Sequence, residues 1–220
     1  MLLSMNVIEL FSSIDGEGKR QGFLTTFLRL HDCNIRCSYC DTLYSYGPES
    51  TFESMSVQAV ADVIEQLENH RITITGGEPL LQEPAVIELI DELTRRNPRY
   101  DFNIETNGTI IPSFHRDNVW FTYDYKTPSS LAEEAMNLDI FKVATPADII
   151  KFVVGSMQDL DRMDEILKTY PTDAQIFVSP VWGNIEGATI IEYMKAHNWQ
   201  NVRFQLQIHK FIWDPGAKGV

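Results

Sequence analysis

Segments that favour β-strands and segments that favour α-helices alternate along most of this 220-residue chain. Runs rich in β-branched and aromatic residues indicate strands, whereas apolar residues recurring every three or four positions indicate helices. The repeated order of strand, loop and helix predicts an α/β fold with a mainly parallel sheet. Strands are expected at residues 7–11, 23–30, 71–75, 101–106, 119–125, 149–154, 175–179 and 202–208, and helices at 56–70, 84–96, 131–137, 157–170 and 186–197.

The length of the chain limits which parallel architecture it can form. A closed eight-fold barrel needs ~250 residues, whereas this chain supplies about six parallel strands with fewer covering helices. We therefore expect a partial, open TIM-like barrel, and a flat doubly wound sheet is the alternative. No internal repeat, low-complexity stretch or linker divides the sequence, so a single domain over residues 1–220 is expected. Residues 12–18 are expected to form a loop, and the tail at 209–220 to be irregular.

Charge and hydropathy narrow the range of partners. The chain has 18 basic and 31 acidic residues, a net charge of −13, which disfavours direct binding to nucleic acid. No apolar run approaches the ~20 residues of a membrane span. The N-terminal segment 1–10 carries Glu9 and no basic region, so it does not resemble a signal peptide. We expect a cytoplasmic protein whose cysteines remain reduced.

The three cysteines of the chain, Cys33, Cys37 and Cys40, lie within eight residues, directly after the strand expected at 23–30. Three thiolates with this spacing can bind one iron–sulfur cube, which usually takes four cysteines. One iron would then lack a protein sulfur and could bind a small molecule. Structural zinc is the main competitor, because zinc also accepts Cys3His sites and His31 is nearby. Unreactive buried thiols are the third possibility.

Polar segments follow three of the other expected strands: G-G-E-P at 76–79, E-T-N-G at 105–108 and Y-K-T-P-S at 125–129. The carboxyl ends of parallel strands meet at one edge of a sheet, where such folds bind their ligands. Each segment taken alone is an ordinary turn. Together with the cysteine loop, they predict one site assembled from several strand ends.

The C-x3-C-x2-C spacing, followed by G-G-E-P, resembles the radical S-adenosylmethionine (SAM) superfamily. The resemblance implies a [4Fe-4S] cluster on the three cysteines and SAM bound to the free iron. It also implies reductive cleavage of SAM to a 5′-deoxyadenosyl radical that abstracts hydrogen from a substrate. The positions that match SAM contacts are Tyr39, Cys40, Asp41, Gly77, Glu78, Asn107, Asp124, Tyr125 and Lys126.

A narrower resemblance, to the 7-carboxy-7-deazaguanine synthase family, rests on D-G-E-G at 15–18, F-L-R-L-H-D-C-N-I-R-C-S-Y-C-D-T at 27–42 and G-G-E-P-L-L-Q at 76–82. It implies a lyase that converts 6-carboxy-5,6,7,8-tetrahydropterin to 7-carboxy-7-deazaguanine with loss of ammonia, in queuosine and deazapurine biosynthesis. It further implies Mg²⁺ bound by Thr42, a homodimer, and a flavodoxin- or ferredoxin-type electron donor. The positions that match pterin contacts are Ile14, Asp15, Gly16, Arg29 and Thr75.

One of these positions departs from the family, which usually has Gln where this chain has Asp15. An amide both donates and accepts hydrogen bonds, whereas a carboxylate only accepts them. Asp15 could still accept from the amino and N–H groups of a pterin. Two other functions remain open from the sequence: a radical SAM activase that installs a glycyl radical on a partner protein, and a zinc-stabilised binding module without catalysis.

Overall fold

One curved sheet runs through the part of the chain that the computed structural model describes, residues 3–220. The first two residues of the segment compared with signal peptides lie outside this range. Among the described residues the sheet has nine strands in the order β3-β1-β2-β4-β5-β6-β7-β8-β9. Their bounds are β1 Ser4–Ile14, β2 Leu24–Leu30, β3 Glu53–Ser56, β4 Arg71–Gly76, β5 Asp101–Thr106, β6 Val119–Tyr125, β7 Ile149–Val154, β8 Gln175–Pro180 and β9 Val202–Phe204.

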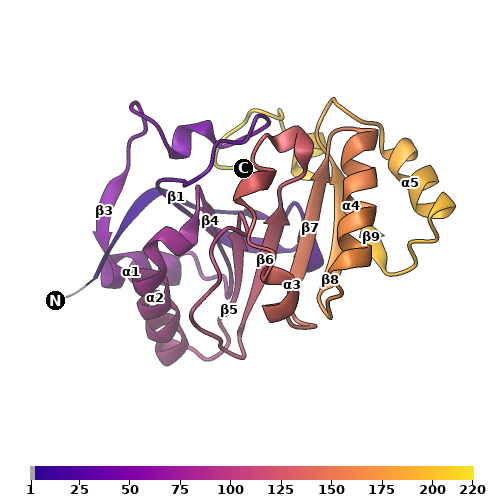
Figure 1. The fold of residues 1–220 in the computed structure, drawn as a ribbon. Helices are drawn as coiled ribbons and strands as arrows, with labels where there is room; N and C mark the ends of the chain where they lie inside the picture. Colours follow the sequence, from indigo (N-terminus) through magenta and orange to yellow (C-terminus); the bar gives the residue numbers. More distant parts are fainter. Residues whose placement is uncertain (1–2) are drawn as a thin grey trace.

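The direction of the strands confirms the expected architecture. β1 is antiparallel to both of its neighbours, β2 and β3. From β2 through β4 to β9 every pairing is parallel, and the sheet stays open because its end strands β3 and β9 do not pair with each other. Helices α1 to α5 lie along one side of the curved sheet (Figure 1). The molecule is therefore a partial barrel, and the alternative of a flat doubly wound sheet is wrong.

Helices begin where the sequence supplies a cap. Ser56 accepts a hydrogen bond from the backbone N–H of Ala59 at the start of α1 (Val57–Gln66), and Ser156 accepts one from Asp159 at the start of α4 (Met157–Thr169). Pro84 stands in the first turn of α2, where its missing N–H costs nothing. The remaining helices are α2 Glu83–Arg96, α3 Ile140–Val143, α5 Gly187–Ala196 and α6 His209–Ile212.

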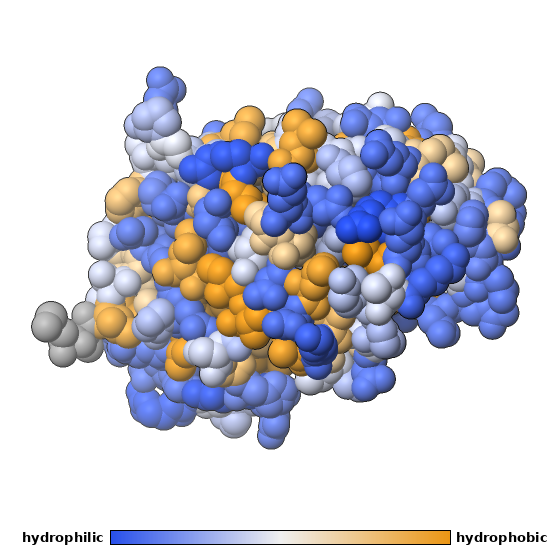
Figure 2. Space-filling view, viewed as in Figure 1, coloured by the Kyte–Doolittle hydropathy of each residue, from blue (hydrophilic) through white to orange (hydrophobic). Residues whose placement is uncertain are grey.

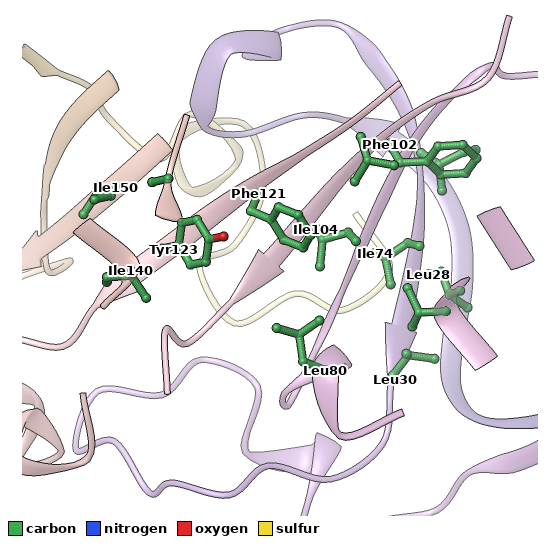
Figure 3. Close-up of a cluster of buried hydrophobic side chains, with 14 of the residues drawn as sticks. Leu28, Leu30, Ile74, Leu80, Phe102, Ile104, Phe121, Tyr123, Ile140 and Ile150 are labelled. Atoms are coloured by element: carbon green, nitrogen blue, oxygen red, sulfur yellow. The ribbon is translucent and has the colours of Figure 1, made fainter. Parts of the chain in front are cut away.

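The helix-facing side of the sheet is apolar. Leu28, Ile74, Ile104 and Phe121 occupy successive register positions on β2, β4, β5 and β6, and all four side chains are buried. Figure 3 shows this row continuing along the sheet to Ile150. The alternate residues of the same strands face the inside of the barrel and are mostly polar. Because successive side chains of a strand point to opposite faces, one face builds the core and the other lines the interior.

The boundaries differ from the sequence expectation in several places. β1 extends to Ile14, so it includes the first part of the loop expected at 12–18, and β3 was not expected. The short helix expected at 131–137 is a 3-10 turn at Glu133–Ala135, with α3 after it. The strand expected at 202–208 ends at Phe204, and the tail expected to be irregular contains α6. The differences lie at the ends of elements or in very short elements, where local pattern is weakest.

Part of the surface is apolar. Hydrophobic residues gather between α2 and α3, over β5 and β6 (Figure 2), where the connection at 107–118 forms no helix. The partly buried residues that pack against the core from this connection and from the segment before α3 are Ile110, Ile111, Phe114, Met136 and Leu138.

No helix within residues 3–220 combines the length and apolar character needed to cross a membrane.

Candidate active site

A single cavity of about 260 Å³ occupies the interior of the barrel and reaches the carboxyl ends of the parallel strands. Its size is close to that of small-molecule binding sites. It brings together nearly every residue that the sequence singled out. The residues that line it are Cys33, Cys37, Cys40 and Thr42, with Tyr39, Asp41, Gly77, Asn107, Asp124 and Lys126 from the expected SAM contacts and Ile14, Asp15, Gly16, Arg29 and Thr75 from the expected pterin contacts.

Hydrogen bonds from two backbone N–H groups of the cysteine loop hold the loop in place. The Asp32 carboxylate accepts the backbone N–H of Cys33 at 2.8 Å, and Ser38 donates its backbone N–H to the carbonyl of Ser130 at 2.9 Å. The three thiols are partly exposed to the cavity. Partial burial raises the pKa of Cys33 and Cys37, so binding iron would release their protons.

The donor set fits an iron–sulfur cube. Three thiols line one cavity, and the side-chain amide of Asn107 points at the sulfur of Cys33, with a nitrogen-to-sulfur distance of 3.7 Å. Within residues 3–220, no group of three His, Cys, Asp or Glu side chains is arranged around a single metal ion. A cube does not require that arrangement, because each cysteine binds a different iron. Cys33, Cys37 and Cys40 would hold three corners of the cluster, and N–H donors to sulfur tune its reduction potential.

The paired glycines after β4 allow two backbone segments to touch. A side chain on Gly77 would overlap the carbonyl oxygen of Asp32, and one on Gly76 would overlap the backbone of Leu30. Gly76 also has φ +140°, which favours glycine. The backbone N–H groups of Gly77 and Glu78 donate to the carbonyls of Leu30 and Asp32. The glycines therefore hold the G-G-E-P turn directly against the start of the cysteine loop.

Glu78 occupies a different place from the other expected SAM contacts. It is fully buried and does not line the cavity. Its carboxylate accepts the backbone N–H groups of Leu80 and Asn107 and the hydroxyl of Thr106, at 2.7–2.9 Å. Glu78 therefore joins the end of β4 to the end of β5, and it fixes the backbone of Asn107, whose side chain reaches Cys33.

The end of β6 divides its residues between the two faces of the sheet. Asp124 and Lys126 point into the cavity and form an ion pair at 3.1 Å. Tyr125, also expected to contact SAM, does not line the cavity; its hydroxyl donates to Glu133 on the opposite face. On the cavity side, burial raises the pKa of Tyr39 to about 12, so its hydroxyl stays protonated and donates to the carbonyl of Val153.

The expected pterin contacts lie on the opposite wall and at the floor. Arg29 is anchored by Glu9, whose carboxylate accepts from the Arg29 Nε at 2.6 Å and from the hydroxyl of Tyr44 at 2.7 Å. Thr75 donates to Glu105 at 2.9 Å. Asp15 is almost fully buried at the floor of the cavity. This wall thus offers one cation and several acceptors to a polar substrate.

Sequence reasoning missed a set of charged residues inside the barrel. Lys151 is buried between Glu17, at 3.2 Å, and Asp124, at 3.1 Å, and so links the floor to the β6 side. Burial raises the pKa of Glu105 to about 7, despite the nearby Lys151. The sequence does hold a signal of these buried ion pairs, the lysine inside the otherwise apolar run Ile149–Val154, because a strand rarely buries an unpaired charge.

The C-terminal segment fills the open side of the barrel. Ile208 donates its backbone N–H to the carbonyl of Gly16, and the side chain of Gln205 accepts from the backbone of Gly18. Farther along, Lys210 lies 3.6 Å from Asp41, in the cysteine loop. His209 and Lys210 both line the cavity, so part of the tail that was expected only to be irregular belongs to the site.

Comparison with known proteins agrees with this geometry. The Radical SAM superfamily model matches residues 29–153, from β2 to β7. A 7-carboxy-7-deazaguanine synthase from Clostridium acetobutylicum is 36% identical over 99% of this chain and 100% of its own length. The chain belongs to the 7-carboxy-7-deazaguanine synthase family of radical SAM enzymes.

Further relatives extend the match. The synthase from Methanospirillum hungatei is 38% identical and covers 96% of this chain and 86% of its own. The crystal structure of QueE from Escherichia coli superimposes with a TM-score of 0.69 at 25% identity, over 92% of this chain and 93% of that one. Because the chain belongs to this family, its cofactors are a [4Fe-4S] cluster and SAM, and its activity depends on Mg²⁺.

Proposed function

We propose that this enzyme converts 6-carboxy-5,6,7,8-tetrahydropterin to 7-carboxy-7-deazaguanine with loss of ammonia, a step of queuosine and deazapurine biosynthesis. The observation that supports this most directly is the single cavity that joins the three-cysteine loop to the floor loop at 15–18. Substrate and product differ by one ammonia, so the conversion needs no net oxidation. A glycyl-radical activase would instead need a surface for a partner protein, and an enclosed polar cavity favours the small substrate.

Residues in different parts of the cavity would bind SAM and the pterin. When bound, the cluster and SAM supply the 5′-deoxyadenosyl radical that starts the reaction. Tyr39, Asn107, Asp124 and Lys126 surround the region beside the cysteines, where SAM would bind. The terminal nitrogens of Arg29 would bind the carboxylate of the pterin, since a planar guanidinium suits carboxylates. Glu9 fixes the orientation of that guanidinium by accepting from its Nε.

Thr42 is the proposed Mg²⁺ ligand. Its hydroxyl lies 3.6 Å from the sulfur of Cys40, and Thr42 and Arg29 line the same cavity. Mg²⁺ keeps several waters and shares oxygen ligands with its substrate, so one hydroxyl from the protein can be enough. A Thr42→Ala variant would need a higher Mg²⁺ concentration for half-maximal activity than the wild type. A Thr42→Ser variant, which keeps the hydroxyl, would need about the same concentration as the wild type. Equal Mg²⁺ dependence in all three proteins would remove Thr42 from this role.

We also propose a homodimer, a single domain over residues 1–220, a cytoplasmic location and a flavodoxin- or ferredoxin-type reductant. The family resemblance supports the dimer and the reductant. One continuous sheet supports the single domain. Thiols that bind a cluster must stay reduced, which supports the cytoplasm. Light scattering after gel filtration, and reduction of the cluster by purified donor proteins, would test the dimer and the donor.

The central experiment is an anaerobic assay of the reconstituted protein with SAM, Mg²⁺, a reductant and carboxytetrahydropterin. The expected result is a deazapurine chromophore, with about four irons bound per chain and with iron lost in Cys33→Ala, Cys37→Ala and Cys40→Ala variants. Cleavage of SAM without any deazapurine would show a radical SAM enzyme that acts on another substrate.

A further inference from the structure

Arg20 is a buried arginine beneath the active-site cavity that does not line it. Its guanidinium makes three short contacts: Nη1 donates to Asp101 at 2.9 Å, and Nη2 donates to the carbonyl of Ile72 at 2.8 Å and to the hydroxyl of Thr73 at 2.7 Å. The group also lies 4.6 Å from the centre of the Trp120 ring. These contacts fix a positive charge at the amino ends of β4 and β5.

The remaining nitrogen of this guanidinium, Nε, faces Asp15 at 3.4 Å. Asp15 lines the cavity together with Gly16 and Glu17 of the floor loop. Its side chain is 3% exposed, so its charge has almost no access to water. Arg20 thus supports the carboxylate from below, on the side away from the cavity.

Burial and one neighbouring charge work against the ionisation of Asp15. Burial raises the pKa of Asp15, and the anion of Glu17 acts in the same direction, while Arg20 opposes them. The hydroxyl of Thr73 and the backbone N–H of Glu17 give further hydrogen bonds to the carboxylate. Arg20 is the cation in direct contact with it, so the charge state of Asp15 depends on this one side chain.

We propose that Arg20 is a positioning residue for substrate recognition, because it holds Asp15 as an ionised acceptor for the N–H groups on the amino-pyrimidinone edge of the substrate. This inference rests on the proposed function. A carboxylate accepts from two neighbouring N–H donors, whereas a protonated acid would present a donor to them. A glutamine at this position would need no such support, since an amide does not ionise.

The test is a cycle of reconstituted holoenzymes: wild type, Arg20→Gln, Asp15→Gln and the double variant, with Arg20→Lys as the conservative control. In Arg20→Gln we expect KM for the pterin to rise about tenfold, the scale of a lost charge-assisted hydrogen bond, with kcat nearly unchanged. The rise should be larger at pH 6.5 than at pH 8.5, because protonation of Asp15 weakens binding. Arg20→Lys should recover much of the affinity.

The double variant separates positioning from general damage to the fold. If Arg20 acts through Asp15, replacing Arg20 in the Asp15→Gln background should change KM by less than about twofold and remove the pH dependence. Iron content and uncoupled cleavage of SAM should stay at wild-type levels throughout. An equal rise of KM in both backgrounds, or no rise in either, would overturn the inference. Failure of the wild type to form a deazapurine would instead refute the proposed function.

Discussion

Glu78 offers a sharp test of how the G-G-E-P turn is built. Its buried carboxylate is the common acceptor for two backbone N–H groups: Oε1 accepts from Leu80 and Oε2 from Asn107. Glu78→Gln keeps the size of the side chain and replaces one oxygen by an NH2 group. Whichever way the amide turns, its NH2 faces one of these two backbone N–H groups, which then loses its acceptor, although the NH2 itself can donate to the hydroxyl of Thr106.

The magnitude follows from the burial of this site. Each buried polar group left without a partner costs about 1–3 kcal/mol, and the variant leaves one backbone N–H in this state at a fully buried site. We therefore expect the free energy of unfolding to fall by about 1–3 kcal/mol. Glu83 is a matched control, because its carboxylate also accepts a backbone N–H, from Ser113, and a second donor, the Ser113 hydroxyl. In Glu83→Gln the amide can donate to that hydroxyl, and water can reach the site.

Urea unfolding of the protein without cluster measures this difference directly. Glu78→Gln should unfold at clearly lower urea than the wild type, while Glu83→Gln should stay within about 0.5 kcal/mol of it. The slopes of the unfolding transitions should agree, so that the midpoints report stability alone. Equal stability of the two variants would refute the reasoning, because it would show that the buried acceptor is not needed.

Three further perturbations probe the same site. Gly77→Ala should abolish iron binding, because the new side chain overlaps the cysteine loop, whereas Gly155→Ala, whose nearest neighbours are 3.4 Å away, should bind iron normally. Glu105 has a pKa raised to about 7 by burial, so its contribution to stability is lost as pH rises from 4.5 to 7; Glu105→Gln should flatten thermal stability over that range. Lys151→Met removes the cation paired with Glu17 and one of the two cations paired with Asp124, which keeps Lys126, and should cost about 3–5 kcal/mol. The exposed Lys168→Met should cost under about 1 kcal/mol, measured by the same urea unfolding.

The strand ends that carry the chemistry were predictable because short motifs determine them. The cysteine loop, the paired glycines and Asn107 each stand at the end of a segment that favours a strand, and parallel strands bring such positions together regardless of loop detail. The tail was not predictable in the same way. Its contacts with Gly16 and Asp41 join residues far apart in the sequence, and no local pattern encodes them. The roles of Glu78 and Tyr125 also depend on which face of the chain they occupy.

The sequence also contains a pattern that predicts the charged interior of the barrel, although strand propensity alone does not reveal it. Parallel strands covered on both faces usually read as continuous apolar runs. Here Arg71–Gly76, Asp101–Thr106 and Val119–Tyr125 alternate between apolar and polar residues instead, and Lys151 interrupts a fourth run. In a parallel sheet, that alternation means that one face packs under helices and the other surrounds a polar ligand. Read with the strand order, it would have placed Glu105, Asp124 and Lys151 in one cavity.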